Sequence, residues 1–110
     1  MSFTEINDVQ SFETLTKYIN FGEKYKIIIK FGTEWCQPCL EMSKILEKIK
    51  EDNNFLLMYN INVENNEFSD IMVEYGIIKI PFLLVFKNNQ LINKIDKLLS
   101  INEIKEIINM

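Results

Sequence analysis

Only two cysteines occur in the chain, and both lie in the stretch FGTEWCQPC, which runs from Phe31 to Cys39. Two residues separate Cys36 from Cys39, a spacing that lets the two sulfurs meet when a helical turn begins between them. Such a pair has three possible uses: a structural disulfide, two ligands of a metal site, or a reversible dithiol that exchanges with other disulfides.

Two of these uses fit the chain poorly. A domain of 110 residues that is 47% hydrophobic can bury a core of its own, and structural disulfides are rare in reducing compartments. A zinc site needs three or four nitrogen or sulfur ligands, and two cysteines without any histidine could close one only if two chains shared four thiolates. We therefore predict no metal site, while a pair that no longer carries out chemistry stays an open alternative.

The position of the pair favours redox chemistry. The β-branched run Ile27–Ile29 predicts a strand buried on both faces, and residues 38–51 have the apolar spacing of an amphipathic helix. Cys36 would then lie at the helix N-terminus, where unpaired amides and the helix dipole favour a thiolate. Cys36 would attack a disulfide, and Cys39, one turn further along a loop restricted by Pro38, would resolve the mixed disulfide.

The remaining elements place this strand–helix junction in an α/β fold. Strands are predicted at 4–6, 26–31, 55–61, 80–86 and 91–95, the last two joined as a hairpin through 87–90. Helices are predicted after an Asp8 cap, with the apolar face Val9, Phe12, Leu15 and Ile19, at 38–51, around 68–75, and after a capping box at Ser100–Glu103. This alternation implies a three-layer sandwich, in which a mixed sheet of five (or four) strands is flanked by about four helices.

Composition and charge limit the possible partners. A net charge of −4 repels phosphate backbones and anionic lipid surfaces, so we expect neither nucleic acid nor a membrane as a partner. The N-terminal residues 1–11 have no basic or apolar segment of the kind found in leader sequences, and no run of 18 apolar residues occurs. We therefore expect one domain, residues 1–110, in a soluble cytoplasmic protein.

At three places the sequence resembles the thioredoxin family. The stretch FGTEWCQPC is similar to the family's strand end and WCxPC active site, with Gln37 in place of the usual glycine. Tyr75–Pro81, written YGIIKIP, resembles the segment that leads to a cis-proline, and Phe86–Gln90 matches the late hairpin turn. The three segments occur in the family's order, and the resemblance covers nearly the whole chain.

The resemblance implies a role for each matching residue. Cys36 would be the nucleophile and Cys39 the resolving thiol, with no cofactor besides the disulfide that they form. Pro81, in the cis form, would face that disulfide and leave the Ile80 backbone free to pair with an extended substrate segment. The implied substrate-binding residues are Trp35, Gln37, Pro38, Ile80 and Pro81.

The largest departure from the family lies at Lys30, six residues before Cys36, where thioredoxins usually have a buried aspartate. A lysine here could be a neutral base with a lowered pKa, a charged group that stabilises a thiolate, or a surface cation whose stem lies along the sheet. We therefore treat Lys30 as a possible modulator of the thiol pKa. The lysine that accompanies the family's aspartate corresponds best to Met58, and Gly32 replaces a second tryptophan.

The resemblance implies a thiol–disulfide oxidoreductase, most simply an intracellular protein-disulfide reductase. Its partners would be protein disulfides and, as the electron donor, a thioredoxin reductase, which gives it a role in electron transport and cell redox homeostasis. The alternative is a thioredoxin-like binding module or subunit in which redox chemistry is secondary. The missing aspartate favours that alternative, whereas the intact WCQPC motif favours the enzyme.

Overall fold

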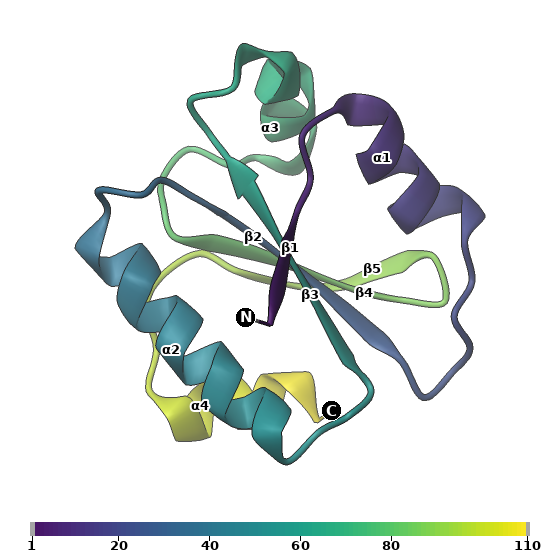
Figure 1. Ribbon diagram of the computed structural model, residues 1–110, viewed down its shortest axis with the longest axis vertical. Coiled ribbons are helices and arrows are strands. Elements are labelled where there is room, and N and C mark those ends of the chain that lie inside the picture. The colour runs from purple at the N-terminus through teal and green to yellow at the C-terminus, as the bar shows by residue number, and fades with distance from the viewer. Residues whose placement is uncertain (1, 110) are drawn as a thin grey trace.

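The computed structural model describes residues 2–109, in which one mixed sheet separates two pairs of helices (Figure 1). The strands are β1 (Phe3–Glu5), β2 (Lys26–Gly32), β3 (Leu56–Asn62), β4 (Phe82–Lys87) and β5 (Gln90–Ile95), in the spatial order β1-β3-β2-β4-β5. The α-helices are α1 (Val9–Glu13), α2 (Gln37–Glu51), α3 (Ser69–Tyr75) and α4 (Ile101–Ile108). The five-stranded form of the predicted sandwich is thus confirmed.

The strand β2 occupies the centre of the sheet, parallel to β3 and antiparallel to β4. Its residues alternate between the two faces, as in any strand. Ile27, Ile29 and Phe31 pack against α1 and α3, whereas Ile28 packs against α2 and α4. Lys30 follows the same alternation as Ile28, and its side chain therefore belongs to the α2 face.

The first helix differs from its prediction. Asp8 caps α1 as expected, because its carboxylate accepts a hydrogen bond from the Ser11 N–H at 2.7 Å. The helix then continues as a π-helical segment, Thr14–Tyr18. The wider π turn moves Ile19 away from the apolar face, so that it is extended in backbone and exposed. The prediction that Ile19 completes the buried face is therefore wrong.

The last two predicted features are confirmed in detail. The turn between β4 and β5 places Asn88 and Asn89 at φ values of 52° and 61°, a left-handed conformation that asparagine tolerates better than most residues. Asn89 donates hydrogen bonds to the carbonyls of Thr16 and Ile19 and so satisfies the end of the π-helical segment. At α4, Ser100 and Glu103 form the reciprocal capping box.

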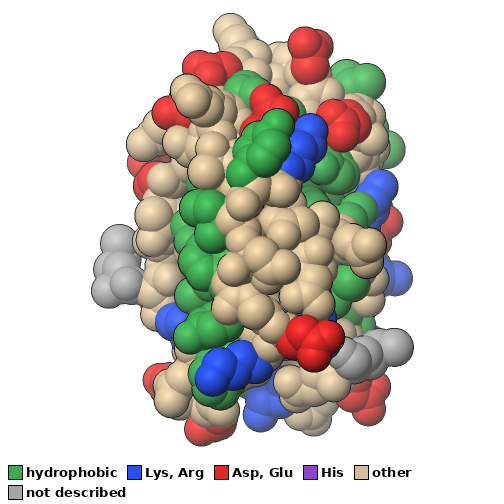
Figure 2. Space-filling model, turned by 90° about the vertical axis from the view of Figure 1, so that its right-hand side faces the viewer, with side chains coloured by type: hydrophobic (Ala, Val, Ile, Leu, Met, Phe, Trp, Pro, Cys, Tyr) green, Lys and Arg blue, Asp and Glu red, His purple; other side chains and the backbone are tan. Residues whose placement is uncertain are grey.

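On the face seen in Figure 2, tan atoms (the backbone and the other polar side chains) fill most of the middle, hydrophobic side chains in green lie beside them, and charged side chains in red and blue lie mainly towards the margins. None of the helices within residues 2–109 has the length and apolar character needed to cross a membrane.

Candidate active site

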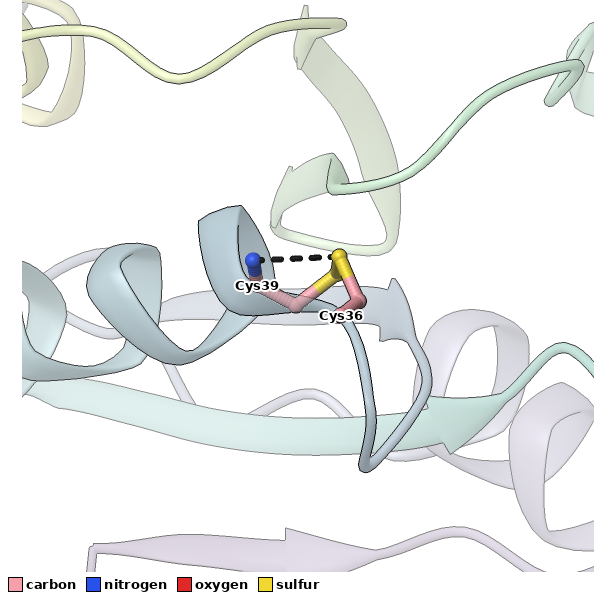
Figure 3. Close-up of a disulfide and its surroundings, with 2 residues drawn as sticks. All are labelled: Cys36 and Cys39. Carbon is pink, nitrogen blue, oxygen red and sulfur yellow. Dashed lines mark hydrogen bonds between the residues drawn. A yellow bond between two sulfur atoms is a disulfide. The ribbon is translucent and has the colours of Figure 1, made fainter.

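The two cysteines lie where β2 gives way to α2, at the N-terminus of that helix (Figure 3). Cys36 is the N-cap residue of α2, and its sulfur accepts a hydrogen bond from the Cys39 N–H at 3.2 Å. Pro38 stands in the first turn, where its missing N–H costs nothing. The pair forms a disulfide with its Cα atoms 5.2 Å apart, and an N–H at the positive end of the helix dipole points at the Cys36 sulfur.

The two cysteines differ in their exposure to solvent. Cys36 retains 6% of its surface, whereas Cys39 retains none. Next to them Trp35 is 72% exposed, and its indole N–H donates to Glu64 Oε2 at 3.3 Å. An incoming disulfide can therefore reach Cys36 first, while the Cys39 sulfur is reached only from within the protein.

Pro81 lies at the same end of the sheet as the two cysteines. The Ile80–Pro81 peptide bond is cis, as the family resemblance implied. Phe82, which follows Pro81, pairs with Phe31 at the end of β2, so Pro81 lies level with Gly32 and with the start of the loop that carries the cysteines. Pro81 is buried and Ile80 half-buried, whereas Gln37 and Pro38 are exposed on the first turn of α2.

Lys30 is buried, which contradicts the interpretation that its ammonium reaches bulk water. Only 6% of the surface of Lys30 is exposed, and its Nζ lies 5.5 Å from the centre of the Phe3 ring. Burial lowers the pKa of Lys30 below its ordinary value, and the charges of Glu5 and Glu47 oppose this effect in part. Among residues 2–109, no carboxylate forms an ion pair with this lysine.

The strand register also corrects the residue expected beside Lys30. Met58 pairs with Ile28, and the residue opposite Lys30 is Asn60. Met58 is a buried member of the apolar core under α2. The amide of Asn60 donates to Glu5 Oε2 at 3.0 Å. A neutral amide and not a methionine therefore borders the lysine, a pairing that the register of β3 decides.

Replacing Lys30 by methionine tests the cost of burying this charge. The pKa of Lys30 in the folded protein lies below 10.5, the ordinary value that it has in the unfolded chain. At a pH between these two pKa values the unfolded chain binds more protons than the folded protein. The stability of the parent therefore rises as the pH increases from the lower pKa to the higher one. We expect Lys30→Met to raise the free energy of unfolding by about 1 kcal/mol near neutral pH and to remove this rise. Chemical denaturation over a pH series measures both effects.

Lys48→Met is the matched control, because it makes the same substitution at a lysine of α2 that is exposed to solvent. Its replacement should leave the pH dependence of the parent unchanged. Equal stability of Lys30→Met and the parent at every pH would contradict the assignment of Lys30 as a buried charge.

Sequence reasoning missed three features around the pair. Glu64, the partner of Trp35, lies 29 positions along the chain, and no local pattern predicts such a contact.

Gly32 has no room for a side chain, because a Cβ there would lie 2.8 Å from Cys39 Sγ and 3.9 Å from Lys30 Nζ. Beside it lies a cavity of about 500 Å³ between β1, β2, β3 and α2. The break in the apolar pattern at Lys30, Thr33 and Asn60 was the available signal.

A metal site finds no support in the described part of the chain, where no three potential ligands among Cys, Asp and Glu lie together. The two thiols instead form a bond with each other. The arrangement suits exchange of one disulfide for another: a sulfur near the surface at a helix N-terminus, and a second sulfur one turn further along beneath it.

Comparison with known proteins agrees with this chemistry. The sequence model of the thioredoxin family matches residues 5–110. The chain is 35% identical to the thioredoxin of Buchnera aphidicola subsp. Baizongia pistaciae over 88 residues, which are 79% of each chain. It is 32% identical to the thioredoxin of Buchnera aphidicola subsp. Acyrthosiphon pisum over 80% of this chain and 81% of that one.

Solved structures give the same result. The oxidised form of mitochondrial thioredoxin 3 from Saccharomyces cerevisiae superposes with a TM-score of 0.79 at 26% identity, covering 98% of this chain and 94% of that one. The sheet order, the flanking helices and the disulfide at the start of α2 thus belong to the thioredoxin fold, and the pair supports thiol–disulfide oxidoreductase function, so that a purely binding role is not favoured. By the match along residues 5–110 and the identity to curated thioredoxins, this chain belongs to the thioredoxin family.

Proposed function

We propose that this oxidoreductase works as a protein-disulfide reductant, with Cys36 as the nucleophile and Cys39 as the resolving thiol. The observation that carries the proposal is the asymmetry of the pair. Cys36 is the sulfur nearer the surface and accepts the Cys39 N–H at the start of α2, while Cys39 is fully buried. A thiolate is favoured at that helix terminus, and only Cys36 can meet an external disulfide.

The proposed reaction has two exchange steps. The Cys36 thiolate attacks a substrate disulfide, which forms a mixed disulfide and releases one substrate thiolate that takes up a proton. Cys39 loses its proton and attacks Cys36 Sγ, which forms the Cys36–Cys39 bond and releases the second substrate sulfur. A dithiol supplied by a thioredoxin reductase then reverses these bonds, so the protein uses no cofactor besides its own disulfide.

The surface around Cys36 supplies the proposed substrate contacts. Trp35 presents an exposed indole beside the pair, and Gln37 and Pro38 form the exposed first turn of α2. Ile80 precedes the cis-proline Pro81 and lies before β4, which begins at Phe82. An extended peptide that pairs with the Ile80 backbone would lie against this surface with its disulfide at Cys36.

Lys30 is proposed to act on the thiol that it approaches. The point where a Gly32 Cβ would be lies 3.9 Å from Lys30 Nζ and 2.8 Å from Cys39 Sγ, so the ammonium and the sulfur are near neighbours. A positive charge near a buried sulfur favours the thiolate. In reduced protein, Lys30→Met should move the appearance of Cys39 thiolate absorbance to higher pH, by about one pH unit for about 1.4 kcal/mol of lost interaction.

The broader assignment is a single-domain protein, residues 1–110, that acts in the cytoplasm on protein disulfides and contributes to electron transport and redox homeostasis, without nucleic acid or membrane partners. A coupled assay tests it: purified thioredoxin reductase with NADPH, this protein, and insulin as the disulfide substrate. We expect continuous NADPH oxidation that depends on the protein. A rate equal to that of reductase and insulin alone would reject the reductase as its electron donor.

The direction of the reaction has its own test. Equilibration of the protein with glutathione buffers measures the fraction of Cys36–Cys39 disulfide at each reducing potential. A reductant keeps its disulfide until the buffer is strongly reducing. A pair that is already reduced in mildly reducing buffer would instead identify an oxidant or isomerase.

A further inference from the structure

The amine of Lys30 lines the cavity of about 500 Å³ that lies between β1, β2, β3 and α2. Only 6% of the surface of this residue is exposed. Among residues 2–109, no carboxylate forms an ion pair with the ammonium and no acceptor forms a hydrogen bond with it. Disulfide exchange uses the charge of Lys30 and leaves its nitrogen without a reaction of its own.

The cavity has the size and the opening that a small organic molecule needs. Pockets of about 300–1,000 Å³ commonly hold small ligands. Phe3, Leu40 and Ile61 contribute apolar side chains to the lining, whereas Glu34 and Lys44 are exposed residues of the same lining. The cavity therefore reaches the surface, and an apolar ring that enters from solvent can approach the Lys30 amine.

Two polar atoms in this lining have no hydrogen-bond partner among the described residues: Thr33 Oγ1 and Asn60 Oδ1. Only 8% of the surface of Thr33 is exposed. Asn60 is the residue opposite Lys30 on β3, and its amide nitrogen already donates to Glu5. A hydroxyl and a carbonyl oxygen are thus available to a ligand in the cavity that the amine lines.

The chemistry of the site follows from the burial of this amine. A lysine nitrogen is a nucleophile only when it is neutral, and an apolar site favours the neutral form because water no longer stabilises the charge. Burial lowers the pKa of Lys30 accordingly. Buried lysines form imines with carbonyl compounds for this reason.

We propose that Lys30 is a reaction site for small uncharged aldehydes, which it binds as an imine inside this cavity. The lone pair of the neutral nitrogen forms a bond to the carbonyl carbon, and the oxygen takes up the proton that the nitrogen loses. The resulting carbinolamine releases one water molecule, which leaves a C=N bond. The step needs neither an oxidant nor a reductant, and addition of water reverses it.

Thr33 and Asn60 are the positioning residues for this step. The Thr33 hydroxyl can donate to the carbonyl oxygen as the new bond forms, and the Asn60 carbonyl can accept from the hydroxyl of the carbinolamine. Both atoms gain the hydrogen bonds that they otherwise lack. An aldehyde supplies the oxygen that makes both contacts.

The charged groups around the cavity favour an uncharged aldehyde. The lining contributes the carboxylates of Glu5, Glu34 and Glu47 and, besides Lys30, the ammonium of Lys44. The three carboxylates outnumber the two cations and disfavour an anionic ligand. Because Glu5 and Glu47 also favour the charged form of Lys30, the reaction should become faster as the pH rises and the amine loses its proton.

Reductive labelling of the oxidised parent tests the proposal. The only two cysteines are joined in the disulfide, so no thiol competes for the probe, which is benzaldehyde with sodium cyanoborohydride at neutral pH. The hydride turns each imine into a stable amine, and peptide mass spectrometry compares the lysines with one another. We expect Lys30 to be labelled at least about tenfold faster than Lys48, since one unit of lowered pKa gives tenfold more neutral amine.

Two comparisons make the result specific to the cavity. Lys44 lines the cavity but is exposed, so it should react at the rate of Lys48. With 4-carboxybenzaldehyde the preference for Lys30 should fall, because the carboxylates disfavour this anion. In urea that unfolds the chain, all three lysines should react alike.

Variants of Thr33 test the positioning role. Thr33→Val should slow the labelling of Lys30 about fivefold relative to Lys48, and Thr33→Ser, which restores the hydroxyl, should recover the parent rate. Thr16→Val is the matched control, because Thr16 is a buried threonine whose hydroxyl donates to the Phe12 carbonyl outside this cavity. It should keep the parent ratio of the two rates.

Equal labelling of Lys30 and Lys48 in the folded parent would overturn the proposal, and so would labelling of the exposed lysines without Lys30. An unchanged ratio in Thr33→Val would reject the role of the hydroxyl. The labelling uses the oxidised protein and no disulfide substrate, so its outcome is independent of the proposed reduction of protein disulfides. Failure of the insulin assay would reject that function and leave the aldehyde site in place.

Discussion

Cys36→Ser is expected to abolish disulfide reduction, with turnover falling by more than about a thousandfold. The reason is chemical: a serine hydroxyl at the same position is not ionised at neutral pH and forms no bond to sulfur, so the helix N–H that points at Cys36 has no thiolate to stabilise. Turbidity from the reduction of insulin measures the rate. Activity equal to that of the parent would remove Cys36 from the mechanism.

Cys39→Ser is the matched variant, since it removes the other sulfur of the same pair. It should retain the first attack and stop afterwards, because no thiol remains to displace the substrate from Cys36. A stable mixed disulfide of one substrate per protein, seen by mass spectrometry, is the expected product. A mixed disulfide that forms on Cys36→Ser and not on Cys39→Ser would reverse the two roles.

The second large effect is expected from Gly32→Ala. An added Cβ would lie 2.8 Å from Cys39 Sγ, closer than real Cβ atoms come to their neighbours, and 3.2 Å from Cys39 Cβ, which is a tight contact. In the oxidised protein the bond to Cys36 holds the Cys39 sulfur in this position, whereas a reduced thiol is released from that constraint. Overpacking of this kind costs about 1–3 kcal/mol, so the substitution should disfavour the disulfide relative to the dithiol.

Equilibration with glutathione measures this shift directly. The expected change is a more easily reduced disulfide, by roughly 20–60 mV, because 30 mV corresponds to about 1.4 kcal/mol for a two-electron couple. Gly22→Ala is the control: a Cβ there meets nothing within 4 Å, and only its φ of +103° opposes the change. That backbone cost is equal in both redox forms, so Gly22→Ala should keep the parent potential. An unchanged potential in Gly32→Ala would contradict the steric argument.

Most elements of the fold could be predicted from local patterns. Ile27–Ile29 predicted the central strand because a continuous β-branched run suits a strand covered on both faces, and Ser100–Glu103 predicted a helix start because the two side chains satisfy each other's backbone N–H. Ile19 was placed wrongly because a π turn changes the period on which the prediction rested. The energy of that turn depends on Asn89, 70 positions away from Ile19.

The parts of the candidate site that are contiguous in the sequence could be predicted. The parts that folding brings together from distant segments could not. Cys36, Pro38 and Cys39 are neighbours in the chain, so their spacing alone indicates a dithiol at a helix start. The contact between Trp35 and Glu64 joins two loops that follow different strands. No periodicity of the sequence encodes such a contact, and only the register of β2 with β3 brings the two loops together.

By itself, the sequence determined the chemistry: two thiols with two residues between them at the start of a helix, and a proline before a late strand. Only the tertiary structure decided the surroundings of that chemistry. It buried Lys30 under α2, set Asn60 and not Met58 beside it, and brought Gly32 against the Cys39 sulfur. The physical reason is that a side chain's reactivity comes from its neighbours across the sheet, and strand register and helix packing, which are not local properties, choose those neighbours.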